Sequence, residues 1–135
     1  MSTLPIPRGN FTPEHLDLVR RQIRLWETND HGAEALADWH PDGVLTAPRG
    51  VHEVSTSLRE VVDGWHLLFT DLHVELTSLF ASSDGRWLSI EWTWQATRKS
   101  DGASGTTPDA IVVELRDGKI ASWREYFDTF GSIEF

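Results

Sequence analysis

The N-terminal half of the chain carries apolar residues at helical spacing. Between residues 12 and 29 they recur every three or four positions, which predicts one amphipathic helix. A short second helix is predicted over Ala33–Trp39. A third is expected to run from Ser57 to about Phe69, because Ser57 and Glu60 form a capping box ahead of an apolar stripe. We therefore expect three helices before the main run of strands.

From about residue 72 the apolar period changes from 3.6 to 2, which indicates strands. The predicted strands are Val44–Ala47, Leu72–Phe80, Trp87–Arg98, Ala110–Leu115 and Ile120–Asp128. Asp117 and Gly118 separate the last two, and this pair favours a type I′ hairpin turn, whose central residues both have positive φ. Lys99–Pro108, which is rich in Ser, Gly and Thr, is expected to be an exposed loop. Helices followed by four long antiparallel strands predict an α+β fold, with the helices on one face of a curved sheet.

The last predicted strand carries polar and aromatic groups on both faces. One face holds Ser122, Arg124, Tyr126 and Asp128, and the other holds Ala121, Trp123, Glu125 and Phe127. A strand with a carboxylate at its far end is more typical of a cavity wall than of a filled core. We therefore expect the rest of the chain to form the other walls of a cavity that this strand lines.

Composition limits the possible functions. The 135 residues fit a single domain, 1–135, with a core at about 12–130. A net charge of −9 disfavours nucleic acid as a partner, and no apolar run is long enough for a membrane span. The chain has no cysteine, and its start lacks the pattern of a signal peptide, so we expect a cytoplasmic protein. Seven Trp residues suit an aromatic-lined pocket, although about half of them are expected to fill the core.

Three stretches resemble a known family. Ala33–Asp42, Phe69–Val74 and Asp117–Asp128 are similar to the SnoaL-like polyketide cyclases of the nuclear-transport-factor-like superfamily. The resemblance implies a cone-shaped, curved antiparallel sheet whose concave face is packed with the three helices and encloses a pocket. It also implies a homodimer through the outer face of the sheet, for which Trp123 and Phe127 are suitable contacts.

The resemblance suggests Asp128 as the acid/base residue, because an acid/base Asp closes the last strand in SnoaL-like cyclases and in limonene-epoxide-hydrolase-like enzymes. The hydrolases also have an Arg-x-Asp pair on the long middle strand, where this chain has Glu91 and Thr93 around Trp92. Ketosteroid isomerases have a Tyr on the first helix and an Asp before a Pro; Gln22 and Ala47 correspond. The chain thus departs from both of these enzyme types.

Other residues are candidates on chemical grounds. Glu91 lies in mid-strand, where a charge is expensive unless it is functional or paired, and Arg124 is a possible partner. His66 is a candidate hydrogen-bond donor to substrate, or a surface residue at a helix end. Asp109 begins a strand near the expected pocket mouth, or forms a turn. The candidate substrate-binding residues are Trp65, Trp92, Trp94, Asp109, Arg124 and Tyr126.

The sequence thus predicts a cofactor-independent enzyme with Asp128, Glu91 and His66 as catalytic residues. The reaction expected is a cyclisation, isomerisation or related proton transfer on a hydrophobic, polyketide- or terpenoid-like molecule. One alternative is a non-catalytic ligand-binding or dimerisation module of the same fold, and another is an epoxide-hydrolase-like enzyme with an altered site. No metal is expected, because His73 and Glu75 lack a third ligand at a recognisable spacing.

Overall fold

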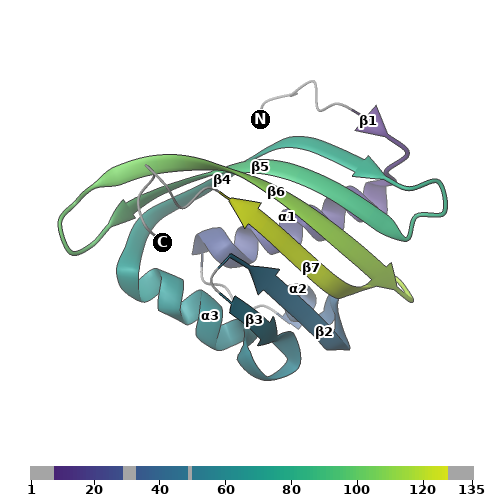
Figure 1. Ribbon diagram of the computed structural model, residues 1–135, viewed down its shortest axis with the longest axis horizontal. Coiled ribbons are helices and arrows are strands. Elements are labelled where there is room, and N and C mark those ends of the chain that lie inside the picture. The colour runs from purple at the N-terminus through teal and green to yellow at the C-terminus, as the bar shows by residue number, and fades with distance from the viewer. Residues whose placement is uncertain (1–7, 29–32, 49, 128–135) are drawn as a thin grey trace.

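The computed structural model describes residues 8–28, 33–48 and 50–127, which form helices and one sheet (Figure 1). The elements are β1 (Arg8–Gly9), α1 (Pro13–Thr28), α2 (Ala33–Ala37), β2 (Trp39–Ala47), β3 (Gly50–Glu53), α3 (Val54–Leu68), β4 (Phe69–Ala81), β5 (Trp87–Arg98), β6 (Ser104–Arg116) and β7 (Lys119–Phe127). Among the helices of these ranges, none has the length and apolarity needed to cross a membrane.

The sheet is curved and mixed, with the strand order β1-β4-β5-β6-β7-β2-β3. Strands β4 to β7 form an antiparallel meander, whereas β1 lies parallel to β4 and β2 lies parallel to β7. In Figure 1 the meander arches over the helices, so the helices cover the concave face. The predicted α+β cone is confirmed, with two parallel pairings that the sequence pattern did not indicate.

Helix α1 begins where its cap predicts. The backbone N–H of His15 donates to Thr12 Oγ1 (3.2 Å), and the backbone N–H of Thr12 donates to His15 Nδ1 (3.1 Å). This reciprocal pair satisfies two polar groups at the helix start, as a capping box does. The apolar stripe of the helix, which includes Val19, Leu25 and Trp26, is buried against the sheet.

The hairpin and the longest strands follow the predicted pattern closely. Asp117 and Gly118 have φ values of 54° and 75°, as a type I′ turn requires. Strand β5 has the predicted bounds, and Leu88, Ile90 and Trp92 alternate inward along it. Helix α3 begins at Val54, before the predicted start at Ser57.

The predicted second helix is too long, because Trp39 belongs to β2. Trp39 pairs with Ile120 of β7, and its indole N–H donates to Gln22 Oε1 (3.0 Å). Residues 40–43, which follow the predicted helix, lie in an irregular part of β2 where the register with β7 shifts. Gly43 is required there, since a Cβ would lie 2.9 Å from the carbonyl oxygen of Ile120.

Two predictions about the meander are wrong. The expected loop Lys99–Pro108 is too long, because β6 begins at Ser104 and pairs with β5 from that residue. The period of two predicted over Leu72–Phe80 places Phe80 on the same face as Leu76, but a register shift between Leu76 and Ser78 reverses the facing of the residues that follow. Phe80 is therefore 40% exposed, while Leu79 takes the inward position opposite Ile90 and is completely buried.

The concave side of the sheet is filled mainly by tryptophan. Trp92 and Trp123 are buried, with ring centroids 5.7 Å apart, and Trp39 packs on Trp123 at 5.9 Å. The expectation that Trp123 lies on the outer face as a dimer contact is wrong, because its side chain is completely buried. The inner face of β7 is the one that carries Trp123 and Glu125.

Candidate active site

The inner faces of three neighbouring strands bring two carboxyl groups together under the tryptophan cluster. Asp109 of β6 lies opposite Trp92 of β5, and Glu125 of β7 lies opposite Ile111, two positions further along β6. Both acidic side chains are almost fully buried, Asp109 at 4% exposure and Glu125 at 8%. Burying two acids costs free energy, so their polar partners decide what they can do.

Each carboxyl group accepts a hydrogen bond from an indole. Trp92 Nε1 donates to Asp109 Oδ2 at 3.0 Å, and Trp123 Nε1 donates to Glu125 Oε1 at 3.0 Å. Tryptophan can only donate, so these bonds fix one oxygen of each acid in place. The tryptophans are therefore positioning groups as well as core residues.

The two carboxyl groups also interact with each other. Burial, the hydrogen bond with Glu125 and the negative charge of Glu125 together raise the pKa of Asp109 to about 10, although the indole donors of Trp92 and Trp94 oppose this change. Ionised carboxylates have only acceptors, so a hydrogen bond between two of them requires a proton. At neutral pH the pair therefore holds one proton, which we place on Asp109.

Aromatic side chains close the space around the pair. A hollow of only about 10 Å³ remains between Trp65, Trp94, Phe127 and the two acids. Trp65 of α3 stacks on Trp94 with ring centroids 5.6 Å apart and planes 16° apart. We call these five residues the carboxyl-pair site. Its remaining space is no larger than one water needs.

Apart from the proton shared with Glu125, two buried oxygens in or next to this site have no hydrogen-bond partner among the described residues. They are Asp109 Oδ1 and Thr107 Oγ1, both on the inner face of β6. Native interiors leave few such groups without partners, and each exception is a candidate contact for a ligand or a transferred proton. This feature separates the carboxyl-pair site from the rest of the core.

Several residues predicted for the site lie on the outer face of the sheet instead. The Glu91 side chain is exposed and accepts a hydrogen bond from Ser78 Oγ at 2.7 Å. Tyr126 is 56% exposed, and the guanidinium of Arg124 lies 6.0 Å from the ring centre of Trp87. The structure thus does not bring Glu91, Arg124 or Tyr126 to the buried pair.

The other predicted residues are divided between the site and its surroundings. Trp65, Trp92, Trp94 and Asp109 are brought together at the carboxyl-pair site. His66 Nε2 lies 2.6 Å from the backbone oxygen of Trp26, which can only accept, so His66 donates there and links α3 to α1. Asp128, the predicted acid/base residue, lies outside the described residues.

Sequence reasoning missed Glu125 as a site residue. The available signal was its place on the β7 face that also carries Ala121, Trp123 and Phe127, an otherwise apolar row. An acid in such a row is buried when the row faces inward. The pattern could not say which face of β7 points inward, because both carry aromatic and polar groups.

Comparison with known proteins defines the family. Residues 19–123 match the family model described as the SnoaL-like domain, and the chain belongs to this family. No curated protein matches the sequence.

Solved structures of the same fold are numerous. An NTF2-like protein of unknown function from Burkholderia pseudomallei has a TM-score of 0.76 and 17% identity, over 87% of this chain and 93% of that one. A protein named as a polyketide cyclase from Pseudomonas putida has a TM-score of 0.71 and 16% identity, over 82% and 89%. A ketosteroid-isomerase-like protein from Catenulispora acidiphila, in complex with trimethylamine, has a TM-score of 0.71 and 16% identity, over 86% of each chain. Similarity at this level of identity establishes the fold alone.

Proposed function

We propose that the chain is a cofactor-independent enzyme that moves a proton on a hydrophobic, carbonyl-bearing small molecule. The observation that carries this proposal is the pair of buried carboxyl groups, Asp109 and Glu125, inside an aromatic wall, and the raised pKa of Asp109 implies that the pair shares one proton. A neutral acid beside a carboxylate supplies both a donor and an acceptor at neutral pH. The family resemblance and a neighbour named as a polyketide cyclase support a polyketide- or terpenoid-like substrate.

The proposed chemistry is an isomerisation or cyclisation through an enol-like intermediate. Glu125 accepts a proton from the carbon next to the carbonyl group; the C–H electron pair forms a C=C bond, and the carbonyl π pair moves to oxygen. The O–H group of Asp109 donates to that oxygen and stabilises its negative charge. Return of the proton from Glu125 to another carbon completes an isomerisation, and no oxidant or cofactor is consumed.

A substrate that enters between Trp65 and Trp94 must move an aromatic side chain, because the hollow enclosed there holds only about 10 Å³. Trp65 is the candidate for this movement. It is half-buried on α3, whereas its stacking partner Trp94 is only 5% exposed. We propose that the substrate ring replaces Trp65 against Trp94, in a similar stacked arrangement.

The test is hydrogen–deuterium exchange at carbon, which does not require the natural substrate. Tetralone and related cyclic ketones are incubated with the protein in D₂O and followed by proton NMR. Asp109→Asn and Glu125→Gln are expected to slow exchange by about 10²–10⁴-fold. Glu91→Gln, on the outer face, is the matched control and should exchange at the wild-type rate. Absence of exchange by wild type, or wild-type rates in both variants, would overturn the proposal.

Asp128 enters the same assay as a separate proposal. The sequence assigns it an acid/base role, so Asp128→Asn should slow exchange as much as Glu125→Gln if the two act on the same proton. Wild-type exchange by Asp128→Asn would remove it from the reaction without affecting the role of the buried pair.

A second candidate function is a non-catalytic module that uses the fold for binding or dimerisation. The observation that favours it is the nearly filled interior, in which each acid is already held by an indole. Under this alternative the pair is structural, and replacing both acids by Asn and Gln leaves ligand binding and dimer formation intact. The predicted homodimer and cytoplasmic location remain predictions, and sedimentation of the purified protein would test the first of them.

A further inference from the structure

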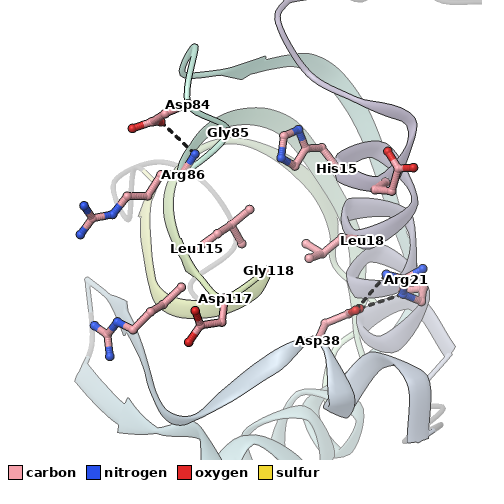
Figure 2. Close-up of a pocket in the computed structure, with 12 residues that line it drawn as sticks. His15, Leu18, Arg21, Asp38, Asp84, Gly85, Arg86, Leu115, Asp117 and Gly118 are labelled. Atoms are coloured by element: carbon pink, nitrogen blue, oxygen red, sulfur yellow. Dashed lines mark hydrogen bonds and ion pairs between the residues drawn. The ribbon is translucent and has the colours of Figure 1, made fainter.

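A second hollow lies at the opposite end of the sheet from the buried acids, between α1 and the turns that join β4 to β5 and β6 to β7 (Figure 2). Its volume is about 610 Å³, and we call it the turn-end hollow. Leu115, in its lining, lies six positions beyond Asp109 on β6, or about 20 Å along an extended strand. The buried residues Ile111 and Val113 fill the space between, so the two hollows are separate.

The floor of the turn-end hollow is apolar. Leu18 of α1 and Leu115 of β6 line it and retain only 5% and 6% exposure. Figure 2 shows the two side chains facing each other across the hollow. A volume of this size over an apolar floor is typical of a site for a small organic molecule.

One hydrogen-bond donor is directed over this floor. The backbone N–H of Thr12 donates to His15 Nδ1, so the neutral imidazole carries its proton on Nε2. Figure 2 shows the His15 ring turned into the hollow beside Gly85. Gly85 has a φ of +72°, and a Cβ at its position would lie 3.7 Å from His15 Nε2, so Gly85 and this nitrogen line the same part of the hollow.

Four charged groups of the lining have hydrogen-bond or ion-pair partners. Arg21 binds both oxygens of Asp38 at 2.9 Å, and Arg86 binds Glu114, just outside the lining, at 2.8 Å. Asp84 accepts from Ser82 Oγ at 2.6 Å. The lining contains four acidic residues and three arginines, so its net charge is not positive and does not attract an anion. These groups disfavour an anion, and the apolar floor favours an uncharged ligand over a cation.

We infer that the turn-end hollow is a second ligand-binding site, for a neutral molecule with an apolar body and an acceptor oxygen. The apolar body lies on Leu18 and Leu115, and the oxygen accepts a hydrogen bond from His15 Nε2. This inference does not depend on the proposed reaction, because it uses none of the residues of the carboxyl-pair site.

The test uses three probes of equal shape and different charge: acetonaphthone, naphthoate and naphthylmethylammonium. Each is titrated into ¹⁵N-labelled protein, and the backbone amide shifts of Gly85, Leu115 and Gly118 are followed by NMR. Acetonaphthone is expected to shift these amides in a saturable manner, and to bind at least about tenfold more tightly than either ion.

Two variants locate the binding. His15→Leu should weaken acetonaphthone binding by about two- to tenfold through the lost hydrogen bond. Leu18→Trp fills the hollow and should abolish the shifts, whereas the same change at Leu67, a 75% exposed residue of α3, should preserve them. Equal affinity for all three probes, shifts outside the hollow, or unchanged binding in both His15→Leu and Leu18→Trp would overturn the inference.

Discussion

Acidic side chains at the two ends of the sheet have pKa values shifted in opposite directions. At the carboxyl-pair site, Asp109 is buried beside Glu125, and burial together with that neighbour raises its pKa to about 10. At the turn-end hollow, Asp84 is fully exposed, and hydrogen bonds from the Ser82 hydroxyl and the Arg86 backbone lower its pKa. Water and nearby donors stabilise the charged form, whereas an aromatic surround stabilises the neutral form.

The two ends also differ in how they use space. The carboxyl-pair site holds an acid with a raised pKa but has a free volume of only about 10 Å³. The turn-end hollow has a volume of about 610 Å³, and several of its charged groups have partners. The turn-end hollow and the acid with a raised pKa therefore lie apart in this molecule.

The largest expected effect is the pH dependence of stability. The native state holds a proton on Asp109 up to about pH 10, whereas the unfolded chain releases it near pH 4. The native state therefore binds more protons between these values, so the free energy of unfolding falls as pH rises, by at most about 1.4 kcal/mol per pH unit. Urea unfolding at pH 5, 7 and 9 should show this fall in wild type, and a flatter profile in Asp109→Asn.

Asp84→Asn is the matched control for this experiment, at the other end of the sheet. A lowered pKa contributes stability above the unfolded pKa and loses it as pH falls, so this variant should change only the acid limb. Its profile between pH 5 and 9 should follow that of wild type. A flat wild-type profile over the same range would contradict the shared proton.

Truncating Trp65, which covers the carboxyl pair, should expose Asp109 to water, as Asp84 already is at the turn-end hollow. Trp65→Ala is expected to cost about 2–3 kcal/mol in the free energy of unfolding, less than a fully buried Trp, because Trp65 is half-buried. Water admitted to the pair should then lower the pKa of Asp109, which carbon-detected NMR of its carboxyl group can follow. If the cover does not exclude water, this pKa will be the same in the variant and in wild type.

The smallest expected effect is the loss of one indole donor. Trp92→Phe leaves Asp109 Oδ2 without its partner and should cost about 1–2 kcal/mol. Trp87→Phe is the same change at a 36% exposed position on the outer face and should alter stability by less than about 0.5 kcal/mol. Urea unfolding of the two variants at pH 7 measures the difference, and equal costs would mean that the indole–carboxyl bond contributes nothing.

The sequence predicted most of the fold, because long periodic segments signal their own structure. The alternation in Trp87–Arg98 and the Asp117-Gly118 turn gave the correct elements. The sequence could not reveal the parallel pairing of β2 with β7, because the two strands are far apart in the chain and neither has a local pattern that indicates its partner. The misplacement of Phe80 has a similar origin, because a single extra residue in a strand reverses every later side chain.

The candidate site was harder to predict than the fold. Asp109, Trp65, Trp92 and Trp94 were selected from the sequence, and they meet at the carboxyl pair. Glu125 was missed, and Glu91 was placed inside although its side chain is exposed. Both outcomes depend on which face of a two-sided strand meets the helices, and this is decided by the packing of the whole sheet.

The parallel pairing of β2 with β7 also bears on how the chain folds. Trp39 and Ile120 lie about 80 residues apart, so their contact closes a very long loop, whereas β4 to β7 are joined by short turns. The meander can thus assemble from local contacts, while β2 can dock only after β7 has formed the edge that receives it. The contact between Trp39 and Trp123 gives refolding experiments a fluorescent reporter of that late step.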